Sequence, residues 1–477
     1  MVIRLFVILS LLILSAPAFA ADDEIALLRK QIKEMEARID RLEAERSKNN
    51  LGARLPHPNP LPVGEGSYGK AGTGEGIINT QTTTATQNPS IEYGKGGGLK
   101  VTSPDKNFQL SMRGFVQADN RTFLQDTSQS NNNNRFYIRS ARPIIEAKFY
   151  DNFNGRLMWD LGAEENALLD AHLDYNAADY ANIRLGKFKL PLGIERWQSE
   201  QNILFVERGL SNNLVPSRDN GVQMYGNIIP HMLEYRIAFT DGSPDTVNAT
   251  DASDNGQAVT ARLFAYPFYN SEIKDLKGLG IGVAGSYGNH QAGVDAPNLA
   301  PGYETPAQSI FFNYLPSTFA DGSNSRLNPQ ITFYNESFGF IGEYIINNQN
   351  VTSGNNSANL QNTAWEAITS YVLTGENARF EGVIPQNEFD PKNNNWGAFE
   401  LAARMGYLKV DAKTFPFFAS LVTSARNARE TTLGGNWYLN QNIKFNINFE
   451  STAFDGGATT GDRRTERAVL GRTQFKF

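Results

Sequence analysis

The residues of this 477-residue sequence that could do chemistry are basic and acidic side chains that alternate with apolar residues. Guanidinium and ammonium groups that line a cavity favour anions, and a guanidinium can hold an oxyanion by paired hydrogen bonds. Taken singly, each of these residues can also be a solvated group that stabilises a neighbouring charge. The charged residues of the alternating segments that would share one polar face are Arg135, Arg139, Arg156, Arg184, Lys444, Arg472, Asp160, Asp170, Asp174 and Glu450.

Enzymatic chemistry has little support in the sequence. The chain contains no cysteine, which excludes thiol catalysis and thiolate metal sites. Its four histidines are scattered, and His172 lies between Asp170 and Asp174 on the expected polar face, away from any nucleophile motif. The net charge of −6 does not resemble a nucleic-acid footprint. We therefore expect no enzyme activity, cofactor, metal or nucleic-acid partner; the enzymatic alternative is a phospholipase.

Residues 1–20 have the pattern of a signal peptide. Arg4 precedes an apolar run from Leu5 to Leu14, and Ala18-Phe19-Ala20 forms a small-x-small cleavage site. The run is shorter than the roughly 20 residues that a membrane-spanning helix needs. An acidic polar stretch follows directly, which favours cleavage before Ala21 over an N-terminal membrane anchor. The protein is expected to be exported.

The next two segments are expected to lie in the periplasm. Residues 21–48 carry apolar residues at alternating spacings of three and four, which predicts a self-associating coiled coil or, as the alternative, an amphipathic helix on another surface. Residues 49–98 contain alternating prolines, glycines and polar residues, which predicts a flexible linker. The apolar coiled-coil positions are Ile25, Leu28, Ile32, Met35, Ile39 and Leu42.

Period-two alternation dominates residues 99–477, for example where Ile443, Phe445, Ile447 and Phe449 alternate with polar residues. Roughly sixteen such segments fit this region, at a spacing typical of membrane strands joined by turns and loops. Mean hydropathy is low, at −0.41, as it is in barrels whose strands alternate. The fold class is therefore predicted as all-β, a transmembrane antiparallel barrel of about sixteen strands, to within two. A soluble sandwich or propeller is the alternative.

Four further features follow from the predicted barrel. The polar segments 241–255 and 288–328 are expected to be extracellular loops, and aromatic residues near strand ends are expected to form interfacial girdles. Alternation slips beside Arg142 and Pro143, which predicts a bulge. The last strand ends on Phe477, like the assembly signal that outer-membrane machinery recognises. The girdle residues are Phe149, Tyr150, Phe415 to Phe418, Trp437 and Tyr438.

At this point the sequence resembles the phosphate-selective porin O/P family. The matching motifs keep their order across the whole predicted barrel, so together they are far more specific than any one of them. They are GGLKV at 97–101, DKNF at 105–108, RGFVQAD at 113–119, RSAR at 139–142, IRLGKFKLPLGIE at 183–195, YVLTGE at 371–376, WGAFELAAR at 396–404, LGGNWYLN at 433–440 and RTQF at 472–475.

The resemblance implies a homotrimer of sixteen-stranded barrels, each with a channel narrowed by an inward-folded loop. The family's pair of arginines before alanine is represented here by Arg139 and Ser140, so one basic group is missing. Arg196 keeps the basic residue after Gly-hydrophobic-Glu, and Asp170 matches the acidic residue of an Asp-x-Ala-like strand. Arg142 and Lys189 stand at two positions near the constriction that can be aromatic in the family. The pore-lining and anion-binding candidates are Arg135, Arg139, Arg142, Arg156, Arg184, Lys189, Arg196 and Asp170.

The sequence thus predicts an outer-membrane porin for small hydrophilic solutes, with a preference for anions such as phosphate. The alternative is a general porin, or one for another solute, whose coiled coil chiefly tethers the membrane to peptidoglycan or other periplasmic partners through residues 22–48. The other expected partners are the lipid bilayer, two further copies of the chain and the assembly machinery.

Overall fold

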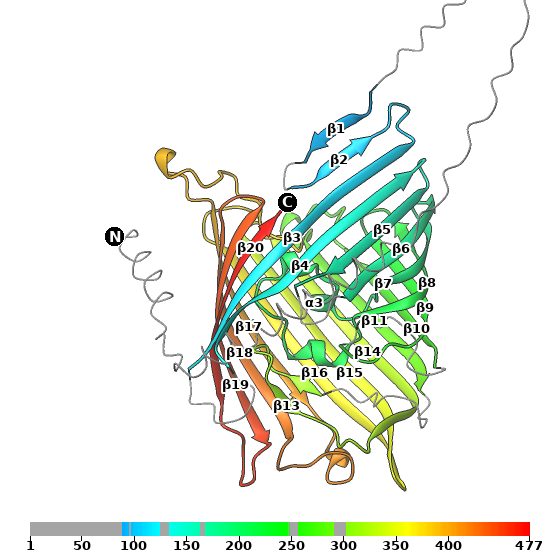
Figure 1. The fold of residues 1–477 in the computed structure, drawn as a ribbon, viewed down its shortest axis with the longest axis vertical. Helices are drawn as coiled ribbons and strands as arrows, with labels where there is room; N and C mark the ends of the chain where they lie inside the picture. The colour runs from blue at the N-terminus through cyan, green and yellow to red at the C-terminus, as the bar shows by residue number, and fades with distance from the viewer. Residues whose placement is uncertain are drawn as a thin grey trace, which may run out of the picture. The chain divides into compact units, whose positions relative to one another are not determined.

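The computed structural model describes residues 88–94, 97–124, 133–162, 167–246, 248, 256–290 and 302–477. The predicted signal peptide, coiled coil and most of the predicted linker lie outside these residues. Within residues 84–477, antiparallel strands close into a barrel of sixteen strands (Figure 1), as the alternation predicted. The strands are β3 (Phe108–Phe123), β4 (Arg135–Phe149), β5 (Phe153–Asp160), β6 (Ala167–Ala178), β7 (Ala181–Lys189), β8 (Arg218–Ile229), β9 (Leu233–Thr240), β10 (Ala258–Ala265), β11 (Leu279–His290), β14 (Phe319–Asn335), β15 (Phe338–Ser353), β16 (Asn356–Val372), β17 (Ala398–Lys409), β18 (Ala425–Tyr438), β19 (Ile443–Gly456) and β20 (Glu466–Lys476).

Closure is made between the last strand and the first barrel strand. β20 pairs with β3, from Ala468 opposite Phe123 to Lys476 opposite Phe115. A closed ring leaves no strand edge with unpaired backbone groups facing lipid, which is the condition for spanning a bilayer with strands. None of the helices in the described part of the chain is long and apolar enough to cross a membrane.

Two short strands extend the sheet outside the ring. β1 (Ser90–Tyr93) pairs with β2 (Leu99–Thr102), which pairs with the first residues of β3. β1 thus lies within the range predicted as a linker, and β2 belongs to the region predicted as barrel without entering the closed ring. Residues 90–93 contain no proline and have Ile91 and Tyr93 at alternate positions, a pattern that favours pairing as a strand; the predicted linker sequence before residue 90 has no such pattern.

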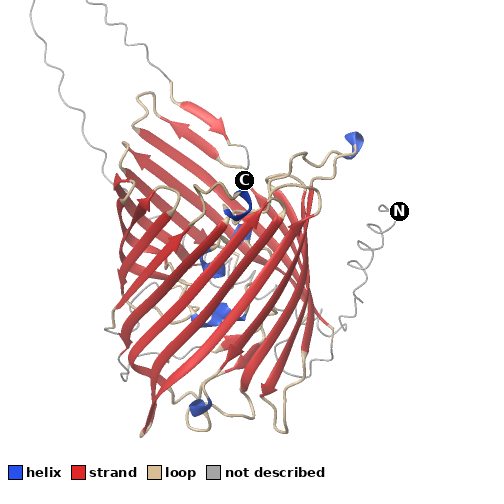
Figure 2. Cartoon of the chain, turned by 180° about the vertical axis from the view of Figure 1, so that it is seen from behind, coloured by secondary structure: helices blue, strands red, loops and turns tan. Residues whose placement is uncertain are grey.

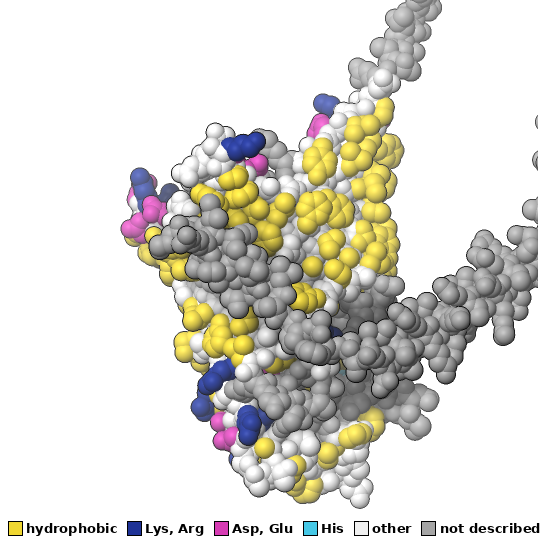
Figure 3. Space-filling model, turned by 60° about the vertical axis from the view of Figure 1, so that its left-hand side comes forward, with side chains coloured by type: hydrophobic (Ala, Val, Ile, Leu, Met, Phe, Trp, Pro, Cys, Tyr) yellow, Lys and Arg dark blue, Asp and Glu magenta, His cyan; other side chains and the backbone are white. Residues whose placement is uncertain are grey.

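Side chains divide between the two faces of the wall as the alternation predicted. In β19, Ile447 and Phe449 are exposed on the outer face, while Asn448 and Glu450 are 1% and 2% exposed on the inner face. Figure 3 shows hydrophobic side chains gathered over the outer wall, with charged side chains near the two ends. The outer face therefore suits contact with lipid chains, and the polar face lines the interior.

Irregularities in two strands change what the alternation predicted. The β3–β4 register shifts at Arg139, so β4 contains a bulge, but it lies three residues before the predicted position at Arg142 and Pro143, where the pairing is regular. A second shift lies between β5 and β6 beside Leu169. Alternation with Asp170 predicts that Leu169 faces outward with Ala171 and Leu173, but Leu169 is 2% exposed and packs with Phe115, Ile144 and Met158. The prediction was wrong because an extra residue in a bulge places two neighbours on the same face.

Some predicted loops and girdles also fold inward. The range 288–328 includes the end of β11, the start of β14 and a hairpin of β12 (Tyr303–Glu304) and β13 (Ile310–Phe312), in which Tyr303, Phe311 and Phe312 are buried. Phe418 and Tyr438 are buried in interior clusters, whereas Phe149, Tyr150 and Phe417 are exposed. Trp437 stacks on Phe399, with ring centroids 5.6 Å apart. Aromatic composition alone did not separate the residues that pack inward from those that form an outer girdle.

Candidate functional site

The connection between β7 and β8, residues 190–217, folds into the barrel, and we call it the inner loop. Its apolar residues Leu192, Phe205, Leu210 and Leu214 are fully buried, and this burial draws the loop away from the rim and into the barrel. Figures 1 and 2 show its short helices inside the ring of strands. These helices are α3 (Ile194–Trp197), η1 (Glu200–Asn202) and η2 (Leu210–Leu214).

The β12–β13 hairpin and the β16–β17 connection pack against the inner loop. Tyr303 and Phe312 of the hairpin belong to the same buried cluster as Leu210 and Leu214. In the β16–β17 connection, the carbonyl of Phe380 accepts a hydrogen bond from Gln198 Nε2 of the inner loop at 2.6 Å. The inner loop is therefore fixed by contacts with other inward-folded segments as well as with the wall.

On one side, the inner loop lies against carboxylates of strands β15, β16, β18 and β19, which we call the acidic wall. The Ile194 amide donates to Glu343 at 2.9 Å, and the Leu210 amide donates to Glu430 at 3.0 Å. Carboxylates thus satisfy loop N–H groups that would otherwise be buried without a partner. The acidic wall consists of Glu343, Glu366, Glu430 and Glu450, none of which is more than 6% exposed.

The other side of the inner loop faces a group of cations that we call the basic side. Most of them are partly exposed, whereas the acidic wall behind the loop is buried. Solvent therefore reaches these cations more than it reaches the acidic wall. The basic side consists of Arg139, Arg142, Arg156, Arg184, Lys189, Arg196, Arg208, Arg218 and Arg236.

Several cations of the basic side are neutralised by nearby carboxylates. Asp170 accepts hydrogen bonds from Arg218 at 2.7 Å and from Arg156 at 3.0 Å. Asp174 holds Arg184 by two hydrogen bonds, of 2.7 and 2.8 Å. Asp170 thus lies among the basic residues as a structural anchor, and these pairs fix the orientation of their guanidinium groups.

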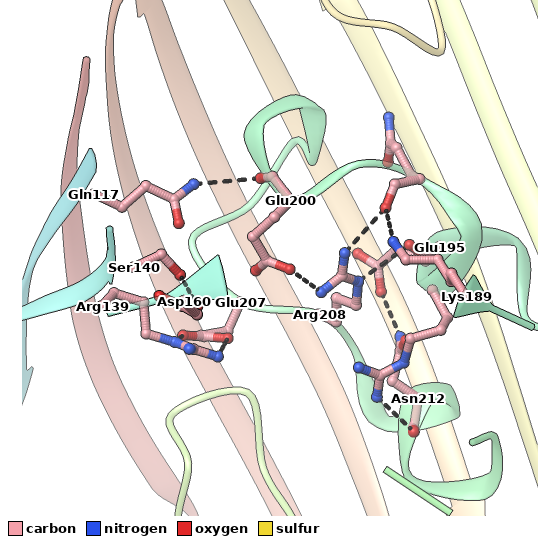
Figure 4. A network of polar contacts seen from close by, with 12 residues as sticks. Gln117, Arg139, Ser140, Asp160, Lys189, Glu195, Glu200, Glu207, Arg208 and Asn212 are labelled. Atoms are coloured by element: carbon pink, nitrogen blue, oxygen red, sulfur yellow. Dashed lines mark hydrogen bonds and ion pairs between the residues drawn. The ribbon is translucent and has the colours of Figure 1, made fainter. Parts of the chain in front are cut away.

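Two ion pairs hold the inner loop in place: one joins it to strand β4, and the other links two residues within the loop. Arg139 of β4 pairs with Glu207 of the loop, and Arg208 pairs with Glu200 within the loop (Figure 4). Arg142 pairs with Asp160 at 2.7 Å and approaches Glu200 at 3.7 Å. Ion pairs with restricted access to water hold a loop more firmly than exposed ones, because solvent screens them less.

Lys189, Arg196 and Arg236 make no ion pair within the described part of the chain. Lys189 Nζ donates to the Gln198 carbonyl at 3.1 Å, and Arg196 donates to the Asn212 carbonyl at 3.1 Å. The Arg236 guanidinium lies 4.8 Å from the ring centroid of Trp197 and 5.0 Å from that of Tyr225. Carbonyls and aromatic faces orient these cations without cancelling their charge. Their positive charge is left for other anions.

The bulge in β4 places Arg139 and Ser140 side by side on the interior face. Ser140 is fully buried, and its Oγ donates to Asp160 at 3.1 Å. Asp160 also receives the Arg142 guanidinium. At the position where the family has a second arginine, this chain therefore has a hydroxyl that helps to orient the carboxylate partner of Arg142.

The structure brings together most of the predicted site residues. Arg139, Arg142, Lys189 and Arg196 lie around the inner loop, and Arg156, Arg184 and Asp170 lie on the adjoining wall. Arg135 differs from this group: it is exposed at the first residue of β4, with its guanidinium 4.4 Å from the Tyr137 ring centroid. Alternation assigned Arg135 to the polar face of its strand, but alternation does not show how far along the barrel axis a residue lies.

Sequence reasoning missed several residues that this geometry brings to the site. Arg236 alternates with Tyr235 and Ile237 in β9, so the pattern that identified Arg184 could have identified it. Glu200, Glu207 and Arg208 lie in the inner loop, where no periodicity marks a face. Their partners could be recognised only after folding.

Comparison with known proteins agrees with this geometry. The family model "Phosphate-selective porin O and P" matches residues 108–477. Porin O of Pseudomonas aeruginosa is 24% identical over 425 residues, which cover 83% of this chain and 94% of that protein. The outer-membrane channel DcaP of Acinetobacter baumannii has a similar fold, with a TM-score of 0.52 at 11% identity over 79% of this chain and 99% of that one.

The family match covers the whole closed ring, from the first residue of β3 to the last residue of the chain. The matched range includes the inner loop as well as the barrel strands, and family membership implies a channel rather than an enzyme. The chain belongs to the phosphate-selective porin O and P family and is an outer-membrane porin.

Proposed function

We propose that this porin conducts small anions in preference to cations, and that phosphate is among them. The observation that carries the proposal is the position of Arg196 in the inner loop and of Lys189 and Arg236 beside it: all three are partly exposed and make no ion pair within the described residues. The family description and the Porin O relative support the same class of solute. Basic groups at a narrow point favour anions, because they stabilise an ion that has lost part of its hydration shell.

The acidic wall does not oppose this preference. Its four carboxylates are buried behind the inner loop, and two of them, Glu343 and Glu430, accept hydrogen bonds from loop amides, so a permeating ion meets the basic side first. Within the part of the chain that the structure describes, the inner loop thus separates the buried carboxylates of the acidic wall from the cations of the basic side. This separation explains how a chain of net charge −6 can carry an anion-preferring pore.

Purified protein in planar bilayers is expected to show a reversal potential of the sign for anion permeation under a potassium chloride gradient. Added phosphate should reduce the chloride current, because an oxyanion with more charge binds the same cations for longer. A reversal potential of the opposite sign would reject the proposal for anions. A chloride current that phosphate leaves unchanged would reject phosphate as a solute.

We further propose that the N-terminal segment lies in the periplasm and that the porin is a homotrimer. Four connections at the rim where β3 begins, the β4–β5, β6–β7, β8–β9 and β14–β15 turns, are at most three residues long, as is common at the periplasmic rim. A protease cleavage site inserted at residue 90 should be cut by added protease only after the outer membrane has been permeabilised. Cleavage in intact cells would contradict the orientation. The homotrimer has its own test: light scattering of the purified protein in detergent should give the mass of three chains, and the mass of one chain would contradict the trimer.

A further inference from the structure

Arg404 of β17 lies behind the inner loop, with no surface exposed to solvent. Its guanidinium donates to Glu195 of the loop at 3.0 Å and to the carbonyl of Glu207 at 2.9 Å. It also pairs with Glu430 of the acidic wall and lies 4.5 Å from the ring centroid of Phe205. One side chain thus touches the inner loop at three separate residues and the wall at a fourth.

The charges around Arg404 are unbalanced without it. Glu195 of the loop is buried among the four carboxylates of the acidic wall. Arg404 pairs with two of these five glutamates, Glu195 and Glu430, and no other cation in the described part of the chain pairs with any of the five. Both carboxylate oxygens of Glu450 have no hydrogen-bond partner there. Buried like charges repel strongly in a medium of low dielectric constant, so the loop carboxylate would be driven from this wall if Arg404 were absent.

The loop backbone fits closely over this cluster. A Cβ atom built on Gly209 would lie 2.4 Å from a Glu366 oxygen and 3.1 Å from the Arg404 Cδ atom. The Gly209 amide donates to Glu195 at 2.8 Å. The inner loop therefore rests directly on the acidic wall, and its distance from that wall sets the space left on the basic side.

We propose that Arg404 is a positioning residue of the pore: it clamps the inner loop on the acidic wall and so sets the width and anion preference of the path on the other side. The proposal rests on the proposed function for its selectivity part alone. Arg404 itself does not face the path. Its effect is exerted through Glu195 and Glu207, which carry neighbouring segments of the loop.

The test is the Arg404→Met variant, which keeps the length and apolar contact of the side chain and removes its charge. Single-channel conductance is expected to rise by about twofold or more, with frequent fluctuations, because the released loop widens and exposes the path. Anion preference should fall as the acidic wall becomes accessible. Arg404→Lys should restore part of both properties, because it keeps the charge but loses the forked hydrogen bonds.

Arg262→Met is the matched control. Arg262 is also a buried barrel arginine; it pairs with Glu234 and Gln330 and lies 4.3 Å from the Phe264 ring centroid. These partners are on the barrel strands, and they reach the inner loop indirectly, since Phe264 packs in one cluster with Ile194 and Phe205. Loss of Arg262 should therefore change the conductance and selectivity of folded channels much less than loss of Arg404. An equal change in both variants would overturn the proposal, since it would mark a general effect of removing a buried charge.

The remaining outcomes also decide the question. Folded Arg404→Met channels with wild-type conductance and selectivity would overturn the clamp. If Arg404→Met does not fold, Glu195→Gln tests the same contact, because it leaves the pair with Glu430 intact. It should raise conductance less but in the same direction, and no rise would overturn the proposal. A wild-type pore without anion preference would refute the proposed function, while a conductance change in Arg404→Met would still support the clamp.

Discussion

Replacement of Lys189 and Arg196 by glutamate is expected to turn the pore from anion preference to cation preference. Both cations are partly exposed beside the inner loop, and neither forms an ion pair among the described residues. The double variant substitutes negative charges for positive ones beside the proposed path. A unit charge 4 Å from an ion contributes about 4 kcal/mol at an effective dielectric constant near 20, so even a screened fraction should change the permeability ratio by about tenfold or more.

The measurement is the reversal potential of the double variant under the same salt gradient as the wild type. The matched control is Lys148→Glu with Arg429→Glu, which makes the same change in net charge at exposed positions. Surface charges separated from the path by more than a Debye length of about 8–10 Å act weakly on it. If the control changed selectivity as much as the variant, the path would not run along Lys189 and Arg196.

The seam between the last and first barrel strands should be the most sensitive point for stability. Arg472 of β20 holds Asp119 of β3 by two hydrogen bonds of 2.8 Å, and each side chain is 1% exposed. Arg472→Met leaves a buried carboxylate without its partner, which costs about 3–5 kcal/mol of unfolding free energy. Combining it with Asp119→Asn should recover part of this loss, because the unpaired charge is then removed as well.

Urea unfolding of the folded protein in detergent, followed by tryptophan fluorescence, measures this loss. Arg429→Met is the comparison, because its pair with Asp455 is exposed and should contribute about 1 kcal/mol or less. Equal losses in the two variants would show that the Arg472–Asp119 pair contributes no more than a surface pair.

The fold could be predicted from the sequence because a membrane barrel is encoded locally. In β19, each residue's face follows from its parity, since lipid selects apolar side chains outside and water selects polar ones inside. The same parity rule identified Arg156, Arg184 and Asp170 as interior residues. It failed at Leu169, where the bulge shifts the register, and such a shift depends on the partner strand.

The site was predictable only in part, for a reason that its contacts make plain. The sequence by itself determined the barrel, its interior charges and, through resemblance, the presence of an inward loop. Tertiary structure alone decided which charges remain available: Arg404 and Glu195 are 209 residues apart in sequence, and Glu207 meets Arg139 across 68 residues. Alternation assigns a side chain to a face, but ion pairing depends on distances across the enclosed space, and these are fixed only when the loop folds against both walls.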